Sequence, residues 1–163
     1  MTDGVKFSLT GIDELLGKLE GVAHDVKYKG GRFALRKAAN LVANAAKSNA
    51  QRIDDPQSAQ DISKNVAVRW SSRTFKRSGN LAFRVGVMGG AGGNLSHKDQ
   101  SSGLPGGDTR HWRLVEFGTE KARAQPFMRP ALEQNINAAT DEFIKQYDKA
   151  LDRAIKKAAK VKA

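Results

Sequence analysis

The chain has 163 residues, of which 39% are hydrophobic and 7% aromatic, so its length suits a single domain over 1–163 with a largely aliphatic core. It has no cysteine, which excludes disulfides, thiolate catalysis and cysteine-ligated zinc. The formal charge of +11 favours polyanions or acidic protein surfaces as partners. Because the sequence shows neither a leader pattern nor an apolar run of membrane-spanning length, we expect a protein made in the cytoplasm with no membrane partner.

The first part of the chain predicts a strand and a short helix. Apolar residues alternate with polar ones over 5–9, which is the period of a half-buried strand. Helical spacing follows up to Gly21, with apolar side chains at Ile12, Leu15, Leu16 and Leu19. The pair Gly30 and Gly31 then predicts the next break in the chain.

Residues 32–52 predict a helix with a face of small side chains. The positions that recur at helical spacing are Leu35, Ala38, Ala39, Val42, Ala45, Ala46 and Asn49. Such a face permits close approach to another helix or to a sheet, although alanine adds little hydrophobic area. The sequence Asp-Asp-Pro at 54–56 predicts the end of this helix.

Two strands are expected next, over 66–75 and 81–88, with the turn at 77–80. In the second run, alternate apolar residues predict one buried face: Leu81, Phe83, Val85 and Val87. Residues 89–108 hold seven of the sixteen glycines without periodicity, and predict a long mobile loop that becomes ordered on assembly.

The longest helix is predicted near the end of the chain. Pro130 suits a first helical turn, and an apolar stripe follows at steps of three and four: Leu132, Ile136, Ala139, Phe143, Tyr147, Leu151, Ile155 and Ala158. Its basic tip, 156–163, is expected to fray, and part of this charge is explained by the helix dipole alone. The resulting fold class is α+β, with a small antiparallel sheet packed on an alanine-rich helix and a long C-terminal helix.

One region combines basic and aromatic side chains without an acidic residue between positions 69 and 84. Its candidate contact residues are Arg69, Trp70, Arg73, Lys76, Arg77 and Arg84. Cations that flank stacking rings are typical of single-strand nucleic-acid binding, but ordinary core aromatics with a basic outer face give the same pattern. Binding to nucleic acid or to an acidic partner therefore remains an alternative for this face.

No residue set matches a catalytic or metal-binding pattern. An enzyme such as a nuclease would have to use His97, His111 and Glu116, whose spacing fits no ligand motif. The glycines at 89–93 lack the Gly-Lys-Ser/Thr that opens a P-loop helix. We therefore expect no enzyme, no metal and no cofactor, and the simpler role for Glu116 and Glu120 is an ion pair with Arg123 or Arg129.

Two sequence motifs carry a family resemblance. Residues 115–119 read Val-Glu-Phe-Gly-Thr and residues 125–131 read Gln-Pro-Phe-Met-Arg-Pro-Ala. In order and spacing they resemble the signature of the tail-completion or neck protein family of lambda-like and related siphophages. The chain departs from the family's usual pattern at 61–66 and in the length of the loop 89–108.

The resemblance implies a virion structural protein that completes the tail and joins it to the head at the neck. It implies an α+β subunit in a hexameric ring, with copies of itself, other neck and tail proteins, and the DNA that passes through the tail as candidate partners. The residues of the motifs that it singles out for assembly are Glu116, Phe117, Gly118, Thr119, Pro126, Phe127, Arg129 and Pro130.

The motifs also have a physical interpretation. Gly118 can adopt positive φ in a tight turn, Pro126 and Pro130 stiffen a connector, and Phe127 offers a core anchor. We expect Arg129 to pair with Glu116. On this interpretation the motifs fix the angle between the sheet and the long helix.

Overall fold

The structure is a computed structural model that describes residues 20–21, 23–53, 60–89 and 103–160. Its elements in chain order are the π-helical turn η1 (Val26–Gly30), α2 (Gly31–Ile53), α3 (Ile62–Asn65), β1 (Val66–Trp70), α4 (Ser72–Ser78), β2 (Phe83–Val87), α5 (Trp112–Phe117), α6 (Met128–Glu133) and α7 (Ile136–Lys160). The expected strand at 5–9 and the helix at 12–19 lie outside the described residues. None of the described helices is long and apolar enough to cross a membrane.

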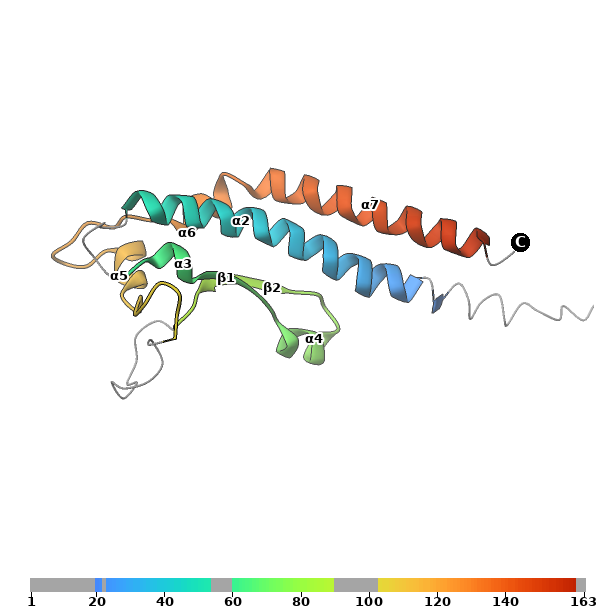
Figure 1. Ribbon diagram of the computed structural model, residues 1–163, viewed down its shortest axis with the longest axis horizontal. Helices are drawn as coiled ribbons and strands as arrows, with labels where there is room; N and C mark the ends of the chain where they lie inside the picture. The colour runs from blue at the N-terminus through green and yellow to red at the C-terminus, as the bar shows by residue number, and fades with distance from the viewer. Residues whose placement is uncertain (1–19, 22, 54–59, 90–102, 161–163) are drawn as a thin grey trace, which may run out of the picture.

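Helix α2 is the central element, and α7 runs antiparallel beside it while the two strands lie on its other side (Figure 1). It matches the helix predicted at 32–52 and ends at Ile53, directly before the Asp-Asp-Pro sequence. Its small side chains provide most of its buried face: Gly31, Ala34, Ala38, Val42, Ala43, Ala46 and Ala50. The alanine-rich face therefore serves close packing, as predicted.

The break predicted at Gly30 and Gly31 is wrong. The helix continues through both residues, and Gly31 has right-handed helical angles, φ −61° and ψ −42°. A Cβ added at Gly30 would lie 2.8 Å from the Cβ of Ala150, and one at Gly31 would lie 2.9 Å from Leu81 Cδ1. The glycines thus allow α7 and the sheet region to approach α2 closely.

The two strands pair antiparallel, with Val66 opposite Val87 and Trp70 opposite Phe83. The first strand is shorter than predicted, because residues 72–78 form α4 in place of a continued strand and the turn at 77–80. Phe75 turns back so that its ring lies 5.5 Å from the Trp70 ring, and this packing requires the chain to curl. Helix α4 ends at Gly79, whose φ of 68° is left-handed.

The last six residues of the predicted mobile loop, 103–108, have a defined structure. Residues 90–102 lie outside the described residues, but Gly103 to Asp108 fold against α3. Asn65 is fully buried and binds three groups there: its Nδ2 donates to Gly107 O (2.9 Å) and Thr109 Oγ1 (2.8 Å), and its Oδ1 accepts from Gly106 N (2.9 Å). The prediction of a mobile loop over all of 89–108 is therefore wrong for residues 103–108.

The long terminal helix is interrupted at Gln134 and Asn135, which separate α6 from α7. Asn135 Nδ2 donates to Ala131 O at 2.9 Å, while its backbone N–H turns to Leu132 O at 3.2 Å. The side chain thus takes the carbonyl that the backbone N–H would bind in a continuous helix. Pro130 lies in a first helical turn as predicted, but that turn belongs to the short α6, and the longest helix begins only at Ile136.

The core lies where α2, α3, β1 and α6 meet, and its buried members are Ala43, Ala46, Ala50, Ile62, Val66, Phe127 and Ala131. Helix α7, by contrast, has no fully buried residue over 136–158. Several of its large apolar side chains are exposed, at Ile136, Ile144, Leu151 and Ile155. The predicted α+β class is confirmed, but the apolar stripe of α7 is only partly covered.

Candidate functional site

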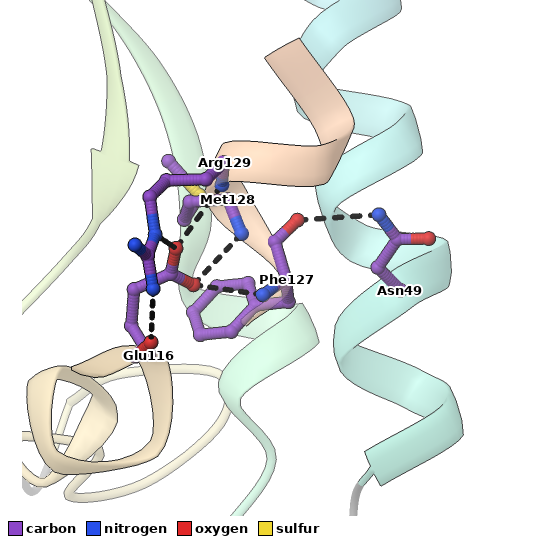
Figure 2. A network of polar contacts seen from close by, with 5 residues as sticks. All are labelled: Asn49, Glu116, Phe127, Met128 and Arg129. Carbon is purple, nitrogen blue, oxygen red and sulfur yellow. Dashed lines mark hydrogen bonds and ion pairs between the residues drawn. The ribbon is translucent and has the colours of Figure 1, made fainter. Parts of the chain in front are cut away.

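The two sequence motifs meet at the carboxylate of Glu116, which is 1% exposed. Its Oε2 accepts from the backbone N–H groups of Phe127 (2.7 Å) and Met128 (2.9 Å). Its Oε1 accepts from the backbone N–H of Arg129 at 3.1 Å and from Arg129 Nε at 3.2 Å (Figure 2). We call these four residues the Glu116 junction.

Within the Glu116 junction, the Glu116 carboxylate caps the N-terminus of helix α6, although it lies far from α6 in the sequence. Phe127 is the N-cap residue and offers no side-chain hydrogen bond of its own. The first N–H groups of a helix need an acceptor and attract negative charge, so a buried carboxylate satisfies them well. Glu116 supplies this acceptor from α5, eleven positions earlier in the chain.

The pKa of Glu116 is lowered from its ordinary value. Burial raises this pKa, but the three backbone N–H donors and the Arg129 guanidinium together outweigh burial because they stabilise the charged form. The carboxylate is therefore ionised at neutral pH, and both oxygens accept hydrogen bonds from the chain itself. It is placed to hold α5 and α6 together.

The predicted pairing of Arg129 with Glu116 is present. Besides its contact with the carboxylate, Arg129 donates through an Nη2 hydrogen bond to the Glu116 carbonyl at 3.0 Å. The guanidinium carbon also lies 5.1 Å from the centre of the Phe117 ring, in a cation–π contact. Arg129 thus binds three groups of α5, while its side chain stays 55% exposed.

Gly118 and Thr119 form the turn after α5, as the first motif predicts. Gly118 has φ 78°, and a Cβ there would lie 2.8 Å from Ala124 N. Thr119 N donates to Ala122 O at 2.9 Å, and its Oγ1 accepts from the N–H of Ala122 at 3.0 Å. The turn returns the chain so that Gln125 N binds Val115 O at 2.8 Å.

Phe127 is fully buried and anchors the junction in the core, as predicted. Asn49 Nδ2 on α2 donates to the Phe127 carbonyl at 3.2 Å (Figure 2). The sequence placed Asn49 on the packing face of its helix but gave it no partner, since only the fold brings together positions 78 apart. Asn65, whose side chain binds residues 106, 107 and 109, was not identified from the sequence. The one feature of the sequence that could have pointed to it is a polar residue directly before a predicted strand.

The residues considered for an enzyme do not converge. His111 is exposed at the start of α5, Glu116 is occupied, and His97 lies outside the described residues. Asp108 binds Arg110 in a short ion pair that lowers the pKa of Asp108. No group of three or more potential metal ligands occurs among the described residues.

The basic residues singled out around the sheet are all exposed. Arg69 and Arg84 face each other across the strands, and both are exposed. Three further exposed cations lie on α4, at Arg73, Lys76 and Arg77. We call these five residues the basic face.

The aromatic residues of the same region pack within the fold. The Trp70 ring lies 5.5 Å from Phe75 and 5.2 Å from Phe83, and the Arg32 guanidinium lies 4.4 Å above it. Phe75 also meets Tyr28 of η1 at 5.6 Å. These contacts hold α4 against η1 and the beginning of α2, and the Arg32 guanidinium covers a face of the Trp70 ring that base stacking would need.

The Glu116 carboxylate is buried and accepts hydrogen bonds on both oxygens, and exposed apolar side chains lie on the two helices that it joins, at Leu114, Phe117 and Leu132. The family model described as "Bacteriophage HK97-gp10, putative tail-component" matches residues 13–118, and the chain belongs to this family of phage tail components. The match includes the first motif up to Gly118 and ends before the second motif. No curated protein and no solved structure matches the chain.

Proposed function

We propose that this tail component completes the phage tail at the neck and joins it to the head, as a hexameric ring of identical subunits. The family assignment supports a virion location in the tail. The resemblance of the two motifs to those of tail-completion proteins supports the neck, and their residues form one connected junction.

The observation that carries the proposal is the uncovered apolar surface of the chain. Large apolar side chains are exposed on both sides of the junction and along α7: Leu114, Phe117, Leu132, Ile136, Ile144, Leu151 and Ile155. A monomer rarely exposes so many apolar side chains along adjoining elements, and such surfaces mark protein interfaces. Neighbouring copies and adjacent tail proteins would cover them.

On this proposal the motif residues act as a frame. Glu116 and Arg129 fix α6 against α5, and Phe127 fixes both against α2. Phe117 and Leu114, which are 59% and 56% exposed, then stand at a fixed angle on the outside of α5. They would contact the next subunit or a neighbouring neck protein. We also propose that residues 1–163 form a single domain, as expected from the sequence.

The test is a stop codon early in the gene, followed by induction and negative-stain electron microscopy of the lysate. We expect unjoined heads and tails, or tails of aberrant length, and rescue by a plasmid copy of the gene. Normal infectious particles without the protein would overturn the neck role.

A second function, binding to DNA through the basic face, is favoured by one observation. Arg69 and Arg84 lie opposite each other in the sheet, and like charges in this position destabilise a strand pair. An anion between them would remove the repulsion. Because the Arg32 guanidinium lies over the Trp70 ring, we propose contact with phosphates, without base stacking on Trp70.

Charge removal tests this second function. For duplex DNA, log K falls as log salt rises, and the double variant Arg69→Ser/Arg84→Ser should make this negative slope shallower by about 1.8, since each lost phosphate contact contributes about 0.9. Lys145→Ser/Lys149→Ser, at two exposed positions of α7, is the matched control. Equal slopes for both variants would exclude a specific role of the basic face.

A further inference from the structure

An apolar groove of about 600 Å³ opens between α2, β2, α6 and α7. One wall comes from Leu35 to Val42 of α2, and the facing wall from Ile136 to Phe143 of α7. Leu132 and Ile136 at its rim are 52% and 54% exposed. Within the described part of the chain, no segment fills the groove, and its apolar walls are uncovered there.

We propose that residues 12–19 of one copy occupy this groove in a neighbouring copy. The inference rests on the proposed ring and names the contact that would link its subunits. It concerns a stretch of sequence outside the described residues, and it depends on the pattern of that stretch, its charge and its distance from the groove.

The sequence pattern of 12–19 fits the groove in chemistry and in length. Its four apolar residues, Ile12, Leu15, Leu16 and Leu19, share one face at helical spacing. Eight helical residues extend about 12 Å, and each long wall of the groove spans eight residues of a helix. An amphipathic segment that lays its apolar face into an apolar groove is a common mode of recognition.

Charge also favours this occupant. Residues 1–20 hold four acidic and two basic side chains, whereas the rest of the chain holds 13 acidic and 26 basic ones. Among the described residues that line the groove, Arg129 is the only cation, and its side chain is 55% exposed. Because Glu116 already pairs with this guanidinium, the attraction would come from the net charges of the two parts, the acidic residues 1–20 of one copy and the basic remainder of its neighbour.

The same copy cannot supply the segment. Residues 20, 21 and 23–25 are helical and lead through η1 into α2, so the nearer end of the groove at Leu35 lies roughly 20 Å from Glu20. Leu19 is bonded to Glu20, and Leu16 reaches at most about 14 Å from it even in a fully extended chain. The apolar face as a whole therefore reaches the groove only in another copy.

This contact joins two different surfaces, the segment of one subunit and the groove of the next. Repetition of such a head-to-tail contact closes a ring or extends a filament, whereas a twofold contact stops at a dimer. The proposed exchange thus accounts for a ring from a single kind of contact.

Cysteine cross-linking in assembled particles tests the exchange, because the chain has no cysteine of its own. The double variant Leu16→Cys/Ala39→Cys would be supplied from a plasmid to the phage that carries the stop codon. Particles that remain infectious show that the variant folds and assembles. After a short bismaleimide treatment, we expect a ladder of covalent multimers on a denaturing gel.

Two matched variants control for proximity alone. Asn44 is exposed on α2 outside the groove, so Leu16→Cys/Asn44→Cys should give no ladder. Lys18 lies off the apolar face of the segment, so Lys18→Cys/Ala39→Cys should cross-link much less. Each single cysteine variant should remain monomeric on the gel.

The outcomes separate this inference from the proposed function. Infectious particles with several copies of the protein but no ladder, a ladder equal in the controls, or a cross-link only within one copy would overturn the exchange and leave the neck role intact. Normal particles that lack the protein would overturn the neck role itself.

Discussion

At the scale of single residues, Glu116 combines two requirements that usually oppose each other. A buried charge is costly unless its hydrogen bonds replace those to water, and here four donors do so. The same bonds supply the acceptors that the first turn of α6 needs. The two motifs are thus linked because Glu116 of the first motif caps helix α6, which begins within the second motif.

Glu116→Gln should destabilise the chain by about 3 kcal/mol, because the neutral amide loses the charge-assisted bonds and directs an NH2 group at a backbone N–H. Urea unfolding monitored by circular dichroism measures this change. Glu120→Gln removes an exposed carboxylate four positions later and should change the stability by less than about 0.5 kcal/mol. Equal effects of the two variants would show that the junction has no special role in stability.

Stability should also depend on pH through Glu116. Its pKa is lowered in the folded state, so its contribution is complete above the ordinary value of 4.5 and is lost as the pH falls through the folded-state pKa. The stability difference between wild type and Glu116→Gln should be constant from about pH 8 to about pH 5 and should shrink below that. A difference that stays constant in acid would contradict the assignment. The comparison removes the parallel contribution of Asp61, whose pKa is also lowered, since both proteins share it.

At the scale of elements, the packing of η1 against α7 depends on the absence of a side chain at Gly30. Gly30 meets Ala150 so closely that even one methyl group would force the helices apart. Glycine costs a helix about 1 kcal/mol relative to alanine. Its presence here shows that the close approach outweighs helix propensity.

Gly30→Ala should therefore destabilise the chain by about 1 to 2 kcal/mol, since overpacking exceeds the gain in propensity. The double variant Gly30→Ala/Ala150→Gly should recover part of this loss, because the methyl group moves to the other helix. Thermal unfolding of both variants measures the effect. Gly21→Ala is the control, as nothing lies within 4 Å of a Cβ at that helical position, and it should be neutral or stabilising. A stabilising effect of Gly30→Ala would contradict the packing argument.

At the scale of the whole molecule, burial is concentrated around α2 while α7 and the outside of α5 remain open. The described chain therefore has a core sufficient to position its elements and an outer surface suited to partners. This division fits a subunit that folds first and assembles afterwards.

Ile155→Lys, at a position 57% exposed on α7, should leave the stability of the free chain within about 0.5 kcal/mol. It should nevertheless reduce the amount of the protein in particles severalfold, because a lysine would be placed in an apolar contact. Immunoblots of purified particles measure incorporation. Asn137→Lys, which adds the same charge at an exposed polar position of α7, should be incorporated normally. Normal incorporation of Ile155→Lys would remove this part of α7 from the interface.

The predictions that the structure confirms are those that depend on local pattern. Helical spacing over 32–52 located α2, alternation over 81–88 located β2, and Pro130 marked the start of α6. The motif residues were expected to form a connector with Glu116 paired to Arg129, and that contact is present. Each of these features is set by side chains within a few turns or by a single recognisable motif.

What the sequence determined by itself is the class of fold, the central helix and the chemistry of the two motifs, because periodicity and backbone restrictions act over short distances. Three features were decided only by the tertiary structure. The glycines at 30 and 31 permit close packing and do not break the helix, and residues 72–78 form a helix that brings Phe75 against Trp70. Asn135 divides the last helix into two. The tertiary structure also decided that Glu116 caps α6 and that Asn49 and Asn65 hold distant segments. These features depend on contacts between residues far apart in the chain, and only the folded backbone brings such partners within hydrogen-bonding or van der Waals distance.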